Sequence, residues 1–168
     1  DNDFTYDDVV DAEVDQSYYS VVMLYQDPDD ELKGKFSAKY NVAAALVDGE
    51  VAVDTFTEEK IADPTINETM GKVRTRVMAK SEEMLTRSED GHKVKITLKD
   101  GRVFEHITAR ADILGSQKNP WGFDNIKAKF QENVALVLDK DGVHQAVDAW
   151  SDILQVSDVP GTIAKTLS

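Results

Sequence analysis

Three histidines and many acidic side chains are the residues from which this sequence could build a catalytic or metal site. The histidines are His92, His106 and His144, and their wide separation matches no metal-ligand spacing. His106 follows Glu105 in a strand pattern and His144 lies in an amphipathic helix pattern, so neither has an obvious catalytic partner. We therefore interpret all three as structural or exposed residues and predict no metal site.

Carboxylate pairs can perform general acid–base catalysis when one member is buried and its pKa is raised. The acidic side chains are most concentrated in two runs, residues 7–15 and 27–31. No pair stands out within these runs, and a solvated acidic surface is the simpler interpretation. The glycines around Gly115 and Gly122 match neither the dinucleotide nor the mononucleotide fingerprint. Taken alone, the residues predict no catalytic pair and no cofactor.

Composition narrows the class of protein. A length of 168 residues with 41% hydrophobic residues predicts one folded domain, with or without a small appendage. A net charge of −13 would repel a phosphate backbone, so we expect no nucleic-acid partner. The chain has no cysteine for a disulfide, a thiolate zinc site or a nucleophile, which fits a reducing, cytoplasmic location.

The sequence also shows no pattern typical of a membrane-spanning helix or a signal peptide. No apolar run approaches the roughly 20 residues of a membrane helix, so we expect no membrane partner. The first residues lack the basic and apolar regions of a signal peptide, and we expect the start of the chain to be truncated.

The first part of the chain alternates between strand and helix patterns. Apolar and acidic residues alternate over residues 10–14, which predicts a short strand at the edge of a sheet. Pro28 and its neighbouring aspartates predict a loop at 26–30. Strong helix formers from residue 35 to a glycine cap at Gly49 predict a helix that is buried on most sides.

Two short helices are expected next, at about 57–62 and 64–72. A capping box of Thr55 and Glu58 would begin the first of them. Asp63 before Pro64 places a capping acid ahead of a proline suited to the first helical position, which would begin the second.

The middle of the chain predicts strands. Residues 74–80 form one strand pattern, and residues 94–98 and 103–108 form a hairpin across Asp100-Gly101, since this dipeptide tolerates the backbone of a tight turn. The irregular segment 112–122 is a candidate functional loop.

The last third predicts helices. Helical spacing of apolar residues indicates amphipathic helices at about 123–138 and 141–155, with a possible final turn after residue 161. The order of elements predicts an α+β fold: a small, mostly antiparallel sheet with helices packed on one face, followed by the C-terminal amphipathic helices. The other face of the sheet is either exposed or covered by chain outside this sequence.

Residues 36–49, FSAKYNVAAALVDG, resemble the sequence motif at the start of the lid-domain helix of the MmgE/PrpD family. That family pattern is phenylalanine, serine, two residues, tyrosine, small apolar residues and Asp-Gly. Further points of likeness recur in the family's order at residues 8–14, Phe56-Thr57, Asp63-Pro64, 94–101, 115–120 and Lys129-Phe130. The likeness covers nearly the whole chain. The segment Trp121-Gly122-Phe123 departs from the family, which more often has a leucine and a capping serine or threonine there.

The resemblance implies an enzyme with a large, mostly N-terminal helical domain and a smaller α+β lid. Residues 1–122 would be the lid, and residues 123–168 would return towards the helical domain of the same protein, its expected partner. The implied chemistry is dehydration, decarboxylation or epimerisation of a small di- or tricarboxylic acid such as 2-methylcitrate or cis-aconitate, without cofactor. The main catalytic residues would lie outside this chain, which alone is expected to be inactive. A homodimer is a further expectation.

Tyr40 matches the family tyrosine that faces the cleft between the domains. Its phenol could donate a hydrogen bond to a substrate carboxylate or relay a proton, so it is the candidate catalytic residue. Its neighbours Ser37 and Lys39 are candidate substrate-binding residues. The alternatives are a core tyrosine with a bonded hydroxyl for Tyr40 and a solvated side chain for Lys39.

Two other classes of function stay open. A freestanding interaction module could bind a protein through its acidic surface and C-terminal helices, without catalysis. A small enzyme complete in itself would need a pocket lined by several ionisable groups with displaced pKa values.

Overall fold

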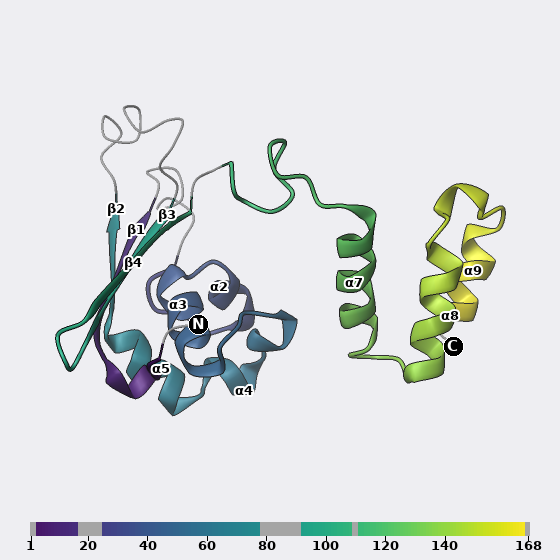
Figure 1. Ribbon diagram of the computed structural model, residues 1–168. Coiled ribbons are helices and arrows are strands. Elements are labelled where there is room, and N and C mark those ends of the chain that lie inside the picture. The colour runs from purple at the N-terminus through teal and green to yellow at the C-terminus, as the bar shows by residue number, and fades with distance from the viewer. Residues whose placement is uncertain (1–2, 17–24, 78–91, 109–110, 167–168) are drawn as a thin grey trace. The chain divides into compact units, whose positions relative to one another are not determined.

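The computed structural model describes residues 3–16, 25–77, 92–108 and 111–166, and these belong to two compact units (Figure 1). Unit 1 spans Asp1–Ile113 and unit 2 spans Leu114–Ser168.

The sheet of unit 1 has strand order β2-β1-β3-β4. The strands are β1 (Val9–Gln16), β2 (Val73–Val77), β3 (His92–Leu98) and β4 (Val103–Thr108). β1 pairs in parallel with β2 and antiparallel with β3, and β3 and β4 form an antiparallel hairpin. This confirms the predicted α+β fold with a mostly antiparallel sheet. The predicted edge position of the first strand is wrong, because β1 has a neighbour on both sides.

Partners on both neighbouring strands explain why an acidic strand can be central. Asp11 accepts hydrogen bonds from Nε and Nη2 of Arg74 at 2.6 and 2.7 Å, and Asp15 accepts from the same atoms of Arg76 at 2.7 and 2.8 Å. Glu13 lies beside Arg74 on one side and beside Lys95 on the other. The acids that read as a solvated edge therefore pair with cations from strands far along the chain.

The opposite face of β1 builds the core with the helices, which Figure 1 shows gathered on one side of the sheet. These helices are α2 (Glu31–Lys35), α3 (Ala38–Asp48), α4 (Glu58–Ile61) and α5 (Pro64–Gly71). Short 3-10 turns also lie at Tyr6–Asp8 and Val53–Thr55. The core cluster comprises Ala12, Val14, Tyr40, Ala43, Ala44, Ile61, Ile66 and Val73. Alternation along β1 thus gives one apolar and one charged face.

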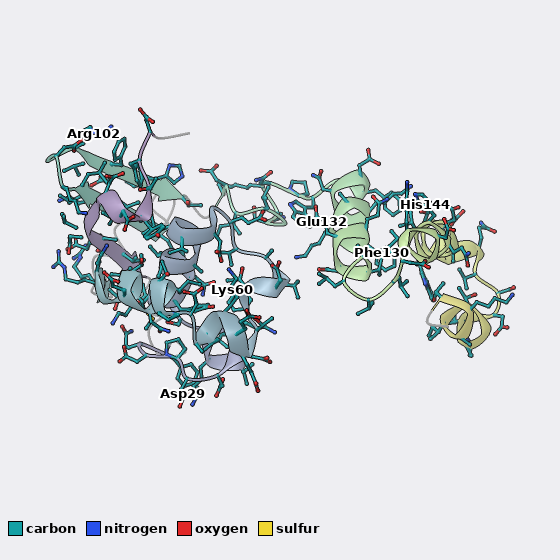
Figure 2. All side chains as sticks on the ribbon, turned by 90° about the horizontal axis from the view of Figure 1, so that it is seen from below. Asp29, Lys60, Arg102, Phe130, Glu132 and His144 are labelled. Carbon is teal, nitrogen blue, oxygen red and sulfur yellow. The ribbon has the colours of Figure 1, made fainter. Side chains whose placement is uncertain are left out.

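The predicted cap of α3 is confirmed. The helix ends at Gly49, whose φ of 86° is left-handed and whose amide donates to the Ala45 carbonyl at 3.0 Å. Lys60 of α4 (Figure 2) donates to both carboxylate oxygens of Asp48, the last residue of α3, at 2.8 and 2.9 Å. The ends of α3 and α4 are thereby joined.

The two short helices occur where they were predicted, but one cap differs. The Oγ1 of Thr57 accepts from the Lys60 amide at 3.3 Å and begins α4, so the Thr55–Glu58 capping box is wrong. Thr55 instead accepts from the Ala52 amide at 3.0 Å within the preceding turn. Asp63 caps α5 as expected, accepting from the Thr65 and Ile66 amides at 2.7 and 3.2 Å.

The hairpin is also confirmed. Gly101 has a φ of 86°, and its amide donates to the Leu98 carbonyl at 3.0 Å to close the turn between β3 and β4. The predicted strand 74–80 corresponds to β2, and its last three positions lie outside the described residues. The sequence patterns gave no indication of α2, a five-residue helix capped by Asp30.

Unit 2 is helical. It contains α7 (Phe123–Val134), α8 (Lys140–Trp150), a 3-10 turn at Ile153–Gln155 and α9 (Val159–Thr166). The helix expected to reach residue 138 ends at Val134 and continues as a tight turn, and Asp139 then caps α8 through the Gly142 amide at 2.8 Å. In the parts of the chain described above, no helix has both the length and the apolar character needed to cross a membrane.

The helices of unit 2 pack around a small apolar cavity of about 150 Å³. Its lining comes from all three helices and the turn between α7 and α8, through Phe130, Val134, Val137, Leu138, Ala146, Trp150, Ile163 and Thr166. Figure 2 labels Phe130 on α7 and His144 on α8.

Candidate functional site

Tyr40, the candidate catalytic residue, lies on α3 with its side chain fully buried. Its hydroxyl donates to the backbone carbonyl of Thr55 at 2.7 Å, and its ring lies 6.1 Å from that of Phe56 between centroids. Burial, with smaller contributions from Asp48 and Asp63, raises the pKa of Tyr40 to about 12. Within unit 1 the phenol is therefore protonated and its proton is engaged. A role for Tyr40 at a cleft stays a prediction.

Ser37 is likewise fully buried and has a local structural task. Its Oγ accepts from the Tyr40 amide at 3.2 Å, which makes it the N-cap of α3. The Ser37 carbonyl accepts from Nδ2 of Asn41 at 2.6 Å. These bonds fix the start of the helix that carries Tyr40, and substrate binding by Ser37 stays a prediction.

Lys39 is the predicted site residue that lines a cavity. The cavity, of about 500 Å³, is a groove along the exposed edge of β2, and we refer to it as the β2-edge groove. Its lining residues are Glu13, Gln26, Lys39, Val73, Arg74, Thr75 and Arg76. A volume of this size lies within the range of small-molecule sites.

Side chains from four separate parts of the chain form the β2-edge groove: β1, the segment before α2, α3 and β2. The hydroxyl of Thr75 donates to Oε1 of Gln26 at 2.8 Å, which ties the segment before α2 to β2. Nζ of Lys39 lies 3.4 Å from Oδ1 of Asp27. The lining contains three cationic residues, Lys39, Arg74 and Arg76, and one acidic residue, Glu13.

Both arginines of the groove are held in place by carboxylates on β1. The bidentate bonds to Asp11 and Asp15 lower the pKa of each carboxyl group, with the arginine hydrogen bond as the main cause. Such a pair occupies two of the five N–H donors of a guanidinium. The arginines are thus positioned, and their charge is largely compensated.

Of the groove residues, the sequence predicted only Lys39. A usable signal was present in the segment Val73–Val77, VRTRV, because alternate residues of a strand share a face and Arg74 and Arg76 therefore project together. Gln26 carried no such signal, since its place depends on the bond to Thr75.

The three histidines are all exposed, which is one of the two alternatives predicted from the sequence. His92 and His106 lie on β3 and β4, and His144 lies on α8. Within the described ranges, no group of three or more histidine, cysteine or acidic residues is arranged to hold a metal ion.

The candidate loop at 112–122 is irregular, with Gly115 at a φ of 84° and its amide donating to the Asn119 carbonyl at 2.9 Å. Nζ of Lys129 lies 5.2 Å from the ring centroid of Trp121, whose buried Nε1 has no hydrogen-bond partner. No cavity of unit 2 described above includes these residues, and a functional role for the loop stays a prediction.

Comparison with known proteins places these features in a family. The model of the MmgE/PrpD C-terminal domain matches residues 6–152. The cis-aconitate decarboxylases of Mus musculus and Homo sapiens are each 26% identical to the chain over 132 residues, which is 78% of this chain and 26% of each relative. The chain thus spans about a quarter of the length of the curated relatives it matches. Because the family match covers most of the chain, including the β2-edge groove, α3, α7 and α8, this chain belongs to the MmgE/PrpD family.

Proposed function

We propose that this chain is the C-terminal part of a lyase or isomerase that acts on a small di- or tricarboxylic acid. The match to the MmgE/PrpD C-terminal domain over residues 6–152 carries the proposal. Support for the substrate class comes from the two relatives, which are named for the decarboxylation of cis-aconitate, a tricarboxylate. The reaction itself would be a dehydration, a decarboxylation or an epimerisation.

Five described residues have displaced pKa values that bear on which group abstracts the proton in the proposed reaction. Arginine partners lower the pKa of Asp11 and Asp15, carboxylate partners raise the pKa of Lys60 and Lys93, and burial raises that of Tyr40 to about 12. Each of these shifts moves away from neutrality. An efficient general base has a pKa near the working pH. None of these five groups is therefore suited to abstract a proton near neutral pH. We propose that the proton-abstracting group comes from the helical domain, and that this chain alone is inactive.

The exposed apolar side chains of unit 2 support a partner for this chain. Large apolar residues exposed on and around α7 and after α8 include Phe123, Ile126, Leu136, Val137 and Leu154. Exposed apolar surface of this kind marks an interaction site. We propose that the helical domain of the same protein covers it.

The test is a turnover assay with 2-methylcitrate, cis-aconitate and iminodisuccinate. The chain, the N-terminal domain of its full-length protein and a mixture of the two are each assayed. Turnover in the mixture alone would support an active site that both parts complete. Turnover by this chain alone would contradict the proposal.

The second candidate is an acidic interaction module without catalysis. The net charge of −13 and the exposed apolar residues of unit 2 favour it. In that case the full-length protein would turn over none of the three acids, while the chain would still bind a protein partner through unit 2.

A further inference from the structure

The ion pair that Lys39 makes at the β2-edge groove is longer than the two bidentate arginine–aspartate pairs beside it, and its carboxylate is more exposed. Nζ of Lys39 lies 3.4 Å from Oδ1 of Asp27, whereas charged N–H···O bonds are usually about 2.7–2.9 Å long. The Asp27 side chain is 80% exposed and that of Lys39 is 21% exposed. Ion pairs with so exposed a partner contribute little to stability. The Lys39 ammonium can therefore exchange Asp27 for another carboxylate at low cost.

Short hydrogen bonds hold both arginines, Thr75 and Gln26 in the lining. Asp11 and Asp15 hold Arg74 and Arg76 through bidentate bonds of 2.6 to 2.8 Å, and Thr75 holds Gln26 at 2.8 Å. The Asp15 side chain is only 9% exposed. A ligand entering the β2-edge groove would thus meet a preorganised wall and one displaceable carboxylate, which is the arrangement that lowers the cost of binding.

We propose that the β2-edge groove binds a carboxylate of a small polycarboxylic acid, and that Asp27 occupies the place of this carboxylate on Lys39 until the ligand displaces it. The inference rests on the proposed function for the class of ligand and adds the site and the competing residue. The ligand carboxylate bonds to Lys39, and the amide of Gln26 lies in the same lining to donate to it.

The charge balance of the groove sets the expected behaviour. Asp11 and Asp15 already compensate both arginines, so an anion gains most from Lys39 and only after Asp27 has left. Binding should therefore be weak and should weaken further with salt, because exposed charges are screened. Removing the charge of Asp27 should strengthen it.

The test is calorimetric titration of citrate into this chain at low ionic strength, with four single variants. Asp27→Asn should tighten citrate binding by about 3- to 10-fold, since the internal competitor is gone. Lys39→Met should weaken it by about 10-fold or more. The matched controls are Asp29→Asn, in the same acidic run (Figure 2), and Lys99→Met, at the turn between β3 and β4, and both should stay within about 2-fold.

Four results would overturn the inference. The first is that Asp27→Asn binds citrate no more tightly than Asp29→Asn, and the second is that Lys39→Met binds it as well as Lys99→Met. The third is that sulfate at equal ionic strength competes for the groove as well as succinate does, which would indicate general anion attraction. The fourth is an unchanged KM of Lys39→Met in the full-length protein, which would show that the groove does not bind the substrate carboxylate while the proposed reaction stands. Citrate binding with the expected variant pattern, in a full-length protein that turns over no acid, would support the groove and contradict the reaction.

Discussion

The hydroxyl of Tyr40 on α3 donates to the backbone carbonyl of Thr55 at 2.7 Å, and both residues are buried. The bond joins α3 to the turn that precedes α4, 15 positions further along the chain. Thr55 in turn closes that turn through the Ala52 amide. Tyr40, which is predicted to face a substrate cleft, thus also stabilises the core through this hydrogen bond. The two roles can be tested separately by measuring stability and turnover.

Replacing Tyr40 with phenylalanine tests how much its hydrogen bond to Thr55 stabilises the fold. The Thr55 carbonyl would stay buried without its donor, so Tyr40→Phe should lower the free energy of unfolding by about 1–3 kcal/mol in urea titrations. Tyr25→Phe removes the hydroxyl of a tyrosine that is 48% exposed, and should change it by less than about 0.5 kcal/mol. If Tyr40→Phe instead left stability intact and abolished the proposed turnover by the full-length protein, the hydroxyl would act in the cleft.

Gly34 allows α2 to pack closely on α4. A Cβ at this position would lie 2.5 Å from Cδ1 of Ile61, with Phe56 and Tyr40 side chains 3.5 and 3.6 Å away. Crowding of about 1–3 kcal/mol should outweigh the gain of up to about 1 kcal/mol from helix propensity, so Gly34→Ala should lower the thermal midpoint.

Gly71 provides the matched comparison, because a Cβ there would meet nothing within 4 Å at the end of α5. Gly71→Ala should leave the thermal midpoint unchanged or raise it slightly, in line with a gain of up to about 1 kcal/mol. Equal effects of the two substitutions would mean that contact with Ile61 does not limit residue 34.

Local chemistry explains which parts of the fold the sequence could predict. The cap at Gly49, the turn at Gly101 and the start of α5 at Asp63-Pro64 each depend on residues within a few positions, and all three are present. The central place of β1 depends on partners about sixty positions away, since Asp11 pairs with Arg74 and Asp15 with Arg76. An alternating acidic strand reads as an edge until those arginines are known to lie beside it.

The same distinction applies to the candidate site. Lys39 was predicted as a site residue because it precedes Tyr40 in a sequence motif that resembles the family's. Gln26 and Thr75, in contrast, become neighbours only when the chain folds. The short helix α2 contains Gly34 and covers five residues, too few for a helical repeat to be recognised. Residues that build a groove from four segments carry no common sequence pattern.

Acid should weaken the contribution of Asp15 to stability. The hydrogen bond from Arg76 holds the pKa of the folded-state carboxyl below its usual 3.8, so the stabilisation is fully present above that value and is lost as pH falls through the folded pKa. In urea titrations between pH 6 and pH 2.5, wild-type protein should lose more stability below about pH 4 than Asp15→Asn.

Removing the partner of Asp15 should also destabilise the protein most at neutral pH. In Arg76→Met the nearly buried carboxylate loses its cation, and burial then raises its pKa. This variant should be least stable relative to wild type at neutral pH, and the difference should narrow in acid as the carboxyl group takes up a proton. A constant difference across the pH range would show that the ion pair does not control the titration of Asp15.

Substitutions at two valines of unit 2 should distinguish an effect on folding from an effect on partner binding. Val147 is 4% exposed and Val137 is 76% exposed. Val147→Ser should lower the free energy of unfolding by about 2–3 kcal/mol, because it removes buried methyl groups and buries a hydroxyl. Val137→Ser should change it by less than about 0.5 kcal/mol and should instead raise the concentration of the N-terminal domain needed for half-maximal turnover in the mixture. Sedimentation velocity of the mixture measures the same association without turnover. If Val137→Ser associates as wild type does in both measurements, the helical domain does not cover this part of unit 2.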